Sequence, residues 1–427
     1  MKARVIWGLR RLTAIRFMKS LFSWPALAAL LLASFGRADV VTDWNNAALE
    51  AIRVNNTPPP IASRTLAILH ASIYDAVNGI ARTHEPYLVQ SAVSGSASRE
   101  AAASAAAHTA LVNLLPASKS SFDTLHESII AQVPTGPQKS AGLSWGESVA
   151  MQILVARAND GSNATVAVPD GSGPGVWIPT PPAYAPYLLP QWGFVAPFAM
   201  SSSSQFRPPG PPSLDSVQYA EDYNEVKALG SAVGSMRTDE QTLIASFWAD
   251  GAGTETPPGH WNSIAQNIAG PRGKSLEQNA RLFALLNIAM ADAAICAWDA
   301  KYTFHFWHPV TAINYAEPEL DWMSFIVTPP FPDYVSGHST FSGAAATVLE
   351  LFYGTDDLPF AVGSDSFPGV YRSFATPLDA ATEAALSRIY GGIHFRSASA
   401  AGFDAGISIG EWTANHYLRP VGNRSRK

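Results

Sequence analysis

Apolar residues recur at helical spacing along most of the chain. Between residues 63 and 78 an apolar side chain returns every three or four positions, and Gly79 follows the last of them. The same spacing predicts helices over residues 98–115, 120–132, 141–159, 215–229, 339–351, 378–388 and 397–416. No segment repeats with a fixed period, and no domain-sized stretch alternates as strands do. The pattern therefore predicts an all-α fold.

Local signals mark particular helices. Capping boxes at Thr238-Asp239-Glu240-Gln241 and Ser275-Leu276-Glu277-Gln278 predict one helix running toward Trp248 and a long one ending at or near Lys301. In the last predicted helix glycine returns at positions 402, 406 and 410, on one face. Because glycine weakens a helix, this spacing indicates close approach of a neighbouring helix.

Residues 166–214 do not follow this pattern. Proline, glycine, serine and aromatic residues dominate there, as in Trp177-Ile178-Pro179-Thr180-Pro181-Pro182. Proline removes backbone donors and fixes φ, so we expect an irregular excursion that its aromatic side chains anchor to the body. The chain then divides into residues 39–165, an N-terminal helical bundle, the excursion at 166–214, and a C-terminal helical domain at 215–427.

The first 38 residues are expected to lie outside the fold. Basic residues precede an apolar run from Leu21 to Phe35, and Gly36-Arg37-Ala38 resembles a signal-peptidase site. We interpret residues 1–38 as a signal peptide, and an uncleaved anchor is the weaker alternative because the run is short and contains Pro25. The mature protein is expected to have no membrane span and to be exported, either periplasmic or secreted.

Removing this leader changes the charge balance. It contains seven Lys or Arg and no acid, so the remaining chain has 21 basic and 34 acidic residues and a net charge of −13. That balance argues against nucleic acid or an anionic membrane surface as a partner. Cys296 is the only cysteine, which excludes an intramolecular disulfide, and its Ala-rich apolar surroundings favour buried packing.

Three blocks in the C-terminal third carry the candidate chemistry: residues 301–309 (KYTFHFWHP), 335–338 (VSGH) and 387–394 (SRIYGGIH). An oxyanion with several charged oxygens needs cations, N–H donors and an imidazole that bonds its central atom. Arg388 offers a fork of donors, and His394 follows the flexible Gly391-Gly392 turn. Taken alone, this block fits a surface arginine and a core histidine equally well.

The other two blocks supply the remaining parts. Ser336 and Gly337 precede a small-residue helix, so a hydroxyl and the N–H groups of the turn can face one anion, with His338 as an acid or base. Alone, such a sequence is more often an ordinary helix cap. Lys301 and His308 are seven residues apart, which would place both on one side of a helical segment. His305 and Trp307 are expected to be wall or core residues.

Together the three blocks resemble a known superfamily: the vanadium-dependent haloperoxidases, the type 2 phosphatidic acid phosphatases and the bacterial class A acid phosphatases. Its pattern is Lys-x6-Arg-Pro, Pro-Ser-Gly-His and Ser-Arg-x5-His. The longer matches at residues 297–301, 306–309 and 331–341, with 247–251 upstream, are most similar to the haloperoxidase branch. The motif-bearing core spans about residues 240–416.

The resemblance implies two helical bundles with the oxyanion site in the C-terminal one, and it implies roles for single residues. His394 would coordinate vanadium. The vanadate oxygens would be held by Lys301, His308, Ser336, Gly337 through its N–H, and Arg388. His338 would be the acid–base residue, so the implied catalytic set is His338, His394, Lys301 and Arg388.

Two positions depart from the family pattern. His308 stands where the pattern has arginine, so a titratable cation with fewer donors replaces a permanent one. Val335 stands where the pattern has proline, which we expect only to loosen the entry to the turn. Asp250 resembles an acidic residue that supports the arginine cluster of haloperoxidases. Phe331 is similar to the residue of fungal chloroperoxidases at a position where algal bromoperoxidases have histidine.

The expected function is therefore that of a vanadate-dependent haloperoxidase, in which hydrogen peroxide oxidises a halide and the product halogenates a small organic acceptor. The alternative is a phosphomonoesterase that needs no cofactor, in which a phosphate ester is the substrate and His394 becomes phosphorylated. A third possibility is a non-catalytic oxyanion-binding homologue that lost turnover when arginine became His308. The sequence leaves halide preference and oligomeric state open.

Overall fold

The computed structural model describes residues 39–168 and 171–422. The predicted signal peptide, residues 1–38, lies outside the described residues. Within them the α-helices are α1 (Val40–Val54), α2 (Pro59–Ala81), α3 (Arg99–Leu114), α4 (Lys119–Gln132), α5 (Pro137–Arg157), α6 (Val217–Leu229), α7 (Asp239–Phe247), α8 (Thr256–Ala269), α9 (Leu276–Phe304), α10 (Pro309–Ala316), α11 (Gly337–Tyr353), α12 (Pro377–Tyr390) and α13 (Arg396–His416). The 3₁₀ turns are η1 (Pro116–Ser118), η2 (Pro190–Phe194), η3 (Gly270–Arg272) and η4 (Pro318–Leu320).

The all-α prediction is confirmed. Among the described residues the exception is one antiparallel hairpin, in which β1 (Phe360–Gly363) pairs with β2 (Tyr371–Phe374). Both predicted capping boxes form, because Thr238 and Ser275 each accept from the N–H of a glutamine three residues on, and that glutamine caps in return. The spacing did not predict α1, α8 or α10.

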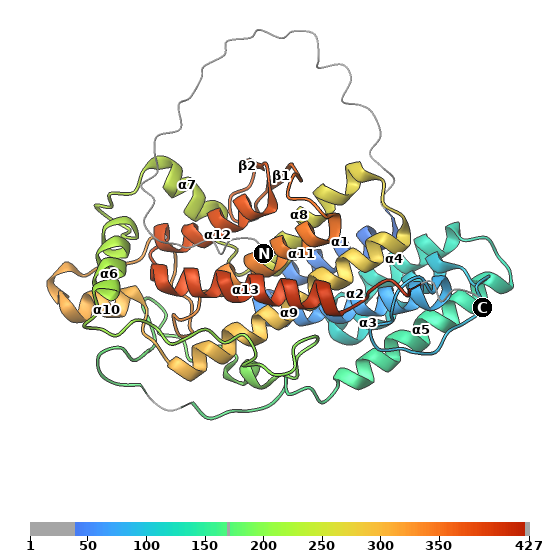
Figure 1. Cartoon of the computed structure of the whole chain (residues 1–427), viewed down its shortest axis with the longest axis horizontal. Coiled ribbons are helices and arrows are strands. Elements are labelled where there is room, and N and C mark those ends of the chain that lie inside the picture. The colour runs from blue at the N-terminus through green and yellow to red at the C-terminus, as the bar shows by residue number, and fades with distance from the viewer. Residues whose placement is uncertain (1–38, 169–170, 423–427) are drawn as a thin grey trace, which may run out of the picture.

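The long helix α9 runs through the middle of the molecule (Figure 1). It packs against α2 of the N-terminal part and also against α11 and α13 of the C-terminal part. Alanines and larger apolar residues alternate around its circumference and are buried almost without exception. Helices α2, α3 and α5 pack on one another on one side of α9, whereas α11, α12 and α13 form the layer on the other side.

Helix α9 is also long and apolar enough to cross a membrane by length and composition alone. Its most apolar 18-residue window is 94% buried inside the fold, however, and a core helix passes the same test. The burial therefore accounts for its composition without a membrane.

The glycine stripe of α13 faces α11, as its spacing predicted. A Cβ at Gly402 would lie 2.7 Å from the carbonyl oxygen of Ser336, and one at Gly406 would lie 2.3 Å from that of Thr340. No real side chain tolerates such distances, so glycine is what lets the two helix backbones touch. This contact fixes the start of α11 against α13.

The Pro-rich excursion lies along α9. Asp292 of α9 accepts three N–H bonds at 2.6–2.8 Å from residues 198–200, and the carbonyl of Leu188 accepts bonds from Trp298 and Tyr302. A backbone bridge joins Val176 to Phe306, just beyond the helix. The excursion therefore packs against the body and braces the end of α9 that carries Lys301.

Candidate oxyanion site

The three sequence blocks meet in the C-terminal part of the fold. Each block places two candidate residues near the end of a helix. In the first block, Lys301 lies in the last turn of α9 and His308 just before α10. In the second, Ser336 is the N-cap of α11 and His338 lies in its first turn, and in the third, Arg388 lies in the last turn of α12 and His394 in the turn before α13. Apart from the half-buried His338, these side chains are all buried. The predicted convergence of these blocks is therefore present.

His394 is held by a carboxylate. Its Nδ1 lies 2.7 Å from Oδ1 of Asp333, and both side chains are buried. Burial lowers the pKa of His394 well below its usual range, and Lys301, His308, Arg388 and His338 lower it further. The ring is therefore neutral. When its Nδ1–H donates to Asp333, the lone pair of Nε2 is left for a ligand.

Asp333 contacts the site, and the sequence reasoning gave it no role. Burial raises its pKa well above the usual range, while the charge of Lys301 and the N–H of Phe395 lower it. Its ligand atom and those of His308 and His394 all lie within 4.8 Å of one another. A carboxyl in the apolar run from Phe331 to Val335 was the available signal, because an acid so placed is buried only with partners.

Arg388 and His338 form a second pair. The Nη1–H of Arg388 donates to Nε2 of His338 over 3.2 Å, and its Nη2–H donates to the carbonyl of Trp248. Burial lowers the pKa of His338 well below its usual range, with Arg388 and His260 adding to the shift, so His338 is a neutral base. Burial lowers the pKa of Arg388 to about 10, which keeps it charged at neutral pH.

Trp248 belongs to the turn after α7, which a buried ion pair holds in place. His260 Nδ1 lies 3.2 Å from Oδ1 of Asp250, and its ring stacks on Trp248. Burial alone lowers the pKa of His260, but Asp250 outweighs it and raises the pKa above its usual value. Asp250 thus supports the arginine through His260 and the backbone of this turn.

The start of α11 has the form of an anion cradle. The Ser336 hydroxyl oxygen accepts bonds from the N–H and the hydroxyl of Ser339, which leaves its own hydrogen free to be donated. The Ser336 carbonyl accepts from Thr340 N–H. The N–H groups of Gly337 and His338 belong to the first turn, where no intrahelical partner exists. Ser336, Gly337 and the helix dipole can therefore face one oxyanion.

Lys301 lies against the loop that leads to α11. Its Nζ donates to the carbonyls of Pro332 and Asp333, over 2.7 and 3.1 Å, and lies 4.4 Å from the centre of the Phe331 ring. Burial lowers its pKa to about 7, and the Asp333 carboxylate opposes this shift. A bound anion would favour the charged amine.

His308 is not arranged as the missing arginine would be. Its Nδ1 lies 2.6 Å from the carbonyl oxygen of Ile393, and its Nε2 lies 2.6 Å from that of Phe331. Burial, and then Lys301, lower the pKa of His308 to about 3, although the two carbonyls oppose this shift, so the ring is neutral. A neutral ring has one N–H and can donate to only one of these two carbonyls at a time, and Oδ1 of Asp333 lies 3.6 Å from Nδ1.

The chain is similar in sequence and in fold to several known proteins. Residues 281–423 match the model of the second helical-bundle domain of vanadium chloroperoxidase. The vanadium chloroperoxidase of Curvularia inaequalis is 25% identical, over 84% of this chain and 79% of its own. The crystal structure of the first bacterial vanadium-dependent iodoperoxidase superposes with a TM-score of 0.80 at 28% identity, covering 90% of this chain and 98% of the other.

These matches support a resemblance of the chain to the vanadium haloperoxidase branch of the superfamily. A holo-type bacterial vanadium-dependent chloroperoxidase shares the fold as well, with a TM-score of 0.69 at 18% identity, over 84% of this chain and 92% of that one. At the position of the motif arginine this chain has His308, which faces two backbone carbonyls.

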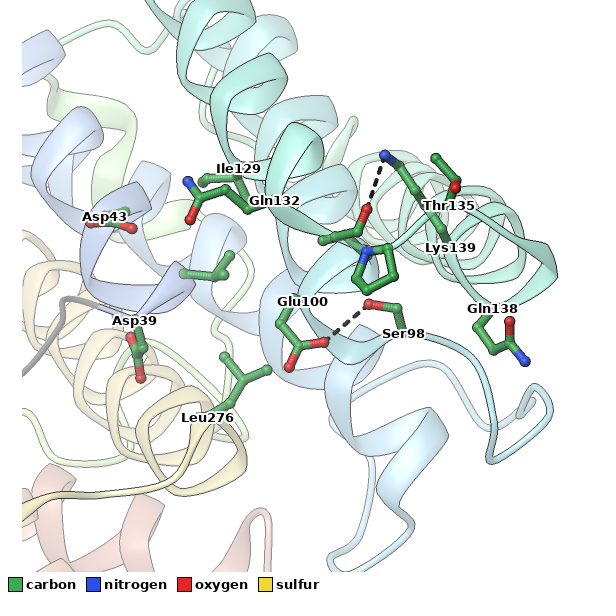
Figure 2. Close-up of a pocket in the computed structure, with 13 residues that line it drawn as sticks. Asp39, Asp43, Ser98, Glu100, Ile129, Gln132, Thr135, Gln138, Lys139 and Leu276 are labelled. Carbon is green, nitrogen blue, oxygen red and sulfur yellow. Dashed lines mark hydrogen bonds between the residues drawn. The ribbon is translucent and has the colours of Figure 1, made fainter.

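A separate cavity of about 700 Å³ lies in the N-terminal part of the fold (Figure 2). Its walls come from the first turns of α1, α3, α5 and α9 and the end of α4, and they carry the acids Asp39, Asp43 and Glu100. Lys139 in its wall is occupied by the carbonyls of Ile130 and Val133. None of the oxyanion-site residues lines this cavity.

Proposed function

We propose that this protein is a vanadate-dependent haloperoxidase, in which hydrogen peroxide oxidises a halide at a vanadate bound to His394. The family supports a peroxidase of this general kind. The observation that carries the finer proposal is the neutral His394, fixed by Asp333 at Nδ1 and surrounded by Lys301, Arg388 and His338. Such an imidazole bonds a central atom through Nε2 while the cations stabilise the oxygens.

The donor set fits vanadate. Nε2 of His394 would supply the bond to vanadium, and Lys301, Arg388, Ser336 and the N–H of Gly337 would hold the oxygens. All five groups come from buried residues, so water competes little for these bonds. Bound vanadate supplies a Lewis acid of unchanging oxidation state that activates hydrogen peroxide toward attack by halide.

His338 is placed to move protons in this site. It is the half-buried member of the group, and it is neutral with Nε2 facing a donor, the Nη1–H of Arg388. A neutral imidazole at this position accepts a proton from incoming hydrogen peroxide and returns it later in the cycle. Arg388 limits the basicity of His338, because a fixed positive charge beside the ring disfavours the imidazolium.

The test is an activity assay of protein prepared without phosphate, supplied with orthovanadate, hydrogen peroxide and iodide, bromide or chloride. Halogenation of a dye that requires added vanadate is the expected result. Release of nitrophenol from its phosphate ester is measured in parallel. Ester hydrolysis that vanadate inhibits, without halogenation, would replace the proposal with a phosphatase. If neither halogenation nor ester hydrolysis were detected, the protein would be an oxyanion-binding protein without catalytic activity.

We also propose that the protein is exported after cleavage behind Ala38. The basic and apolar pattern of residues 1–38 supports this assignment. Sequencing the N-terminus of protein recovered outside the cytoplasm is expected to read from Asp39. A mature protein that keeps its first 38 residues would contradict the assignment.

A further inference from the structure

His308 joins two separate segments of the site. The carbonyl that faces its Nε2 belongs to Phe331, two residues before Asp333 in the loop that leads to α11. The carbonyl that faces its Nδ1 belongs to Ile393, which directly precedes His394 in the turn between α12 and α13. Both contacts measure 2.6 Å, and the ring is buried. One side chain thus spans the two loops that carry the vanadium-binding candidate and its carboxylate.

A second link runs in parallel with the first. The bond from His394 Nδ1 to Asp333 Oδ1 connects the same two loops over 2.7 Å. The rings of His308 and His394 lie 5.3 Å apart, and His308 Nδ1 lies 3.6 Å from the same Asp333 oxygen. Any relative shift of the two loops would therefore stretch the His308 contacts and the His394–Asp333 bond together.

We propose that His308 is a positioning residue, which ties these two loops together and holds His394 against Asp333, and is not itself an oxyanion ligand. The part of the proposal that concerns vanadate affinity rests on the proposed function. The tie between the loops does not, because it exists in the metal-free protein.

The contacts of His308 oppose a direct role in binding. An imidazole has two polar atoms, and here each lies 2.6 Å from a buried carbonyl oxygen, so a ring turned toward an anion would lose its N–H bond to a carbonyl. Arginine at this position has five N–H donors and could serve both purposes. The cations left for an anion are then Arg388 and Lys301, whose charged form a bound anion would favour.

Hydrogen exchange of the metal-free protein tests the tie directly. His308→Ala removes both contacts, and His308→Gln keeps one nitrogen donor, which safeguards folding. His305→Gln is the matched control. His305 lies in the same segment as His308, but its ring packs beside Tyr187 and Tyr302. We expect faster exchange at amides of residues 331–336 and 391–395 in both His308 variants and not in the control. Unchanged exchange at these amides would overturn the proposal.

Vanadate affinity, measured by equilibrium dialysis, separates a positioning role from a ligand role. In a double-mutant cycle with Asp333→Asn, a residue that acts through the His394–Asp333 bond gives losses that are not additive. Each single change is expected to weaken vanadate binding roughly 10- to 100-fold, and the double change little more than either. Additive losses would show that His308 is a direct ligand.

The two measurements also distinguish the failure of this proposal from the failure of the proposed function. If the original protein binds no vanadate, the haloperoxidase proposal falls, whereas the exchange result still decides whether His308 ties the loops. Normal vanadate-dependent halogenation together with unchanged exchange in both His308 variants would overturn the tie alone.

Discussion

At the scale of single residues, the two central histidines share a charge state but not a partner. Burial and neighbouring cations keep His394 and His338 neutral, yet His394 faces a carboxylate and His338 faces a guanidinium. The carboxylate turns the lone pair of His394 toward a ligand, whereas the guanidinium marks Nε2 of His338 as an acceptor. These partners give two identical side chains different tasks.

His394→Gln separates binding from folding. The glutamine amide keeps a donor for Asp333 but removes the ring nitrogen that would bond vanadium. We expect vanadate binding and halogenation to be lost while the melting temperature of the metal-free protein changes by only a few degrees. Dialysis and thermal unfolding measure the two effects. His416→Gln, at an exposed helix end, should change neither, and retained vanadate binding in His394→Gln would contradict the assignment.

Lys301→Met has a pH-dependent effect on stability. Burial lowers the pKa of Lys301 from 10.5 in the unfolded chain to about 7, so between these values the unfolded chain binds more protons. The free energy of unfolding of the original protein should therefore gain from this residue as pH rises from 7 toward 10. The stability of Lys301→Met relative to the original should fall over that range in chemical denaturation. A flat or opposite trend would mean that the amine is not buried as described.

Site residues could be predicted from sequence where the residue type and its order in the chain were enough to indicate an anion site. Lysine, arginine and a Ser-Gly-His turn in fixed order indicated an anion site, and the structure brings these residues together. The geometry of His308 could not be predicted, because it depends on two carbonyls from loops distant in the chain. Asp333 was hidden for the same reason, since its partner lies 61 residues away.

At the scale of elements, helix prediction succeeded where apolar spacing was long and regular. Two of the helices that the spacing missed, α8 and α10, have proline in their first turn. Helix α8 begins with Thr256-Pro257-Pro258-Gly259, which looks like a breaker although proline is compatible with a first turn. Helix α10 also has proline at its first position and has only eight residues, too few for a clear period. A helical segment between Lys301 and His308 would have put both on one side, but α9 ends at Phe304 and His305 adopts positive φ.

Gly402→Ala tests the contact between α11 and α13. The new Cβ would lie 2.7 Å from the Ser336 carbonyl, so the helices must separate. We expect a loss of roughly 1–3 kcal/mol in the free energy of unfolding, together with weaker vanadate binding because Ser336 moves. Gly270→Ala is the control, since its Cβ meets nothing within 4 Å. Wild-type stability in Gly402→Ala would show that the helices do not touch there.

At the scale of the whole molecule, buried carboxylates hold the irregular segments to the helices. Asp292 accepts three N–H bonds from residues 198–200, and Asp75 accepts three from residues 87–89. Each such carboxylate replaces the regular hydrogen bonding that a segment outside helix and sheet lacks. Composition predicted that the excursion would pack on the body but not which residue would anchor it.

Asp292→Asn should release this anchor. The amide cannot accept all three bonds, and each buried donor left unpaired costs about 1–3 kcal/mol. We expect lower stability and faster protease cleavage within residues 171–214. Asp75→Asn should cost similar stability without exposing that segment, which separates local release from general unfolding. Equal cleavage patterns in the two variants would contradict the anchoring role.

Helix α9 belongs to both halves of the molecule and ends at the oxyanion site. The position of Lys301 in the last turn of α9 therefore depends on all the helices that pack along α9. Substitutions in α2 would therefore displace Lys301, although α2 is distant from Lys301 in sequence. Such substitutions in the N-terminal half would lower activity before they caused unfolding.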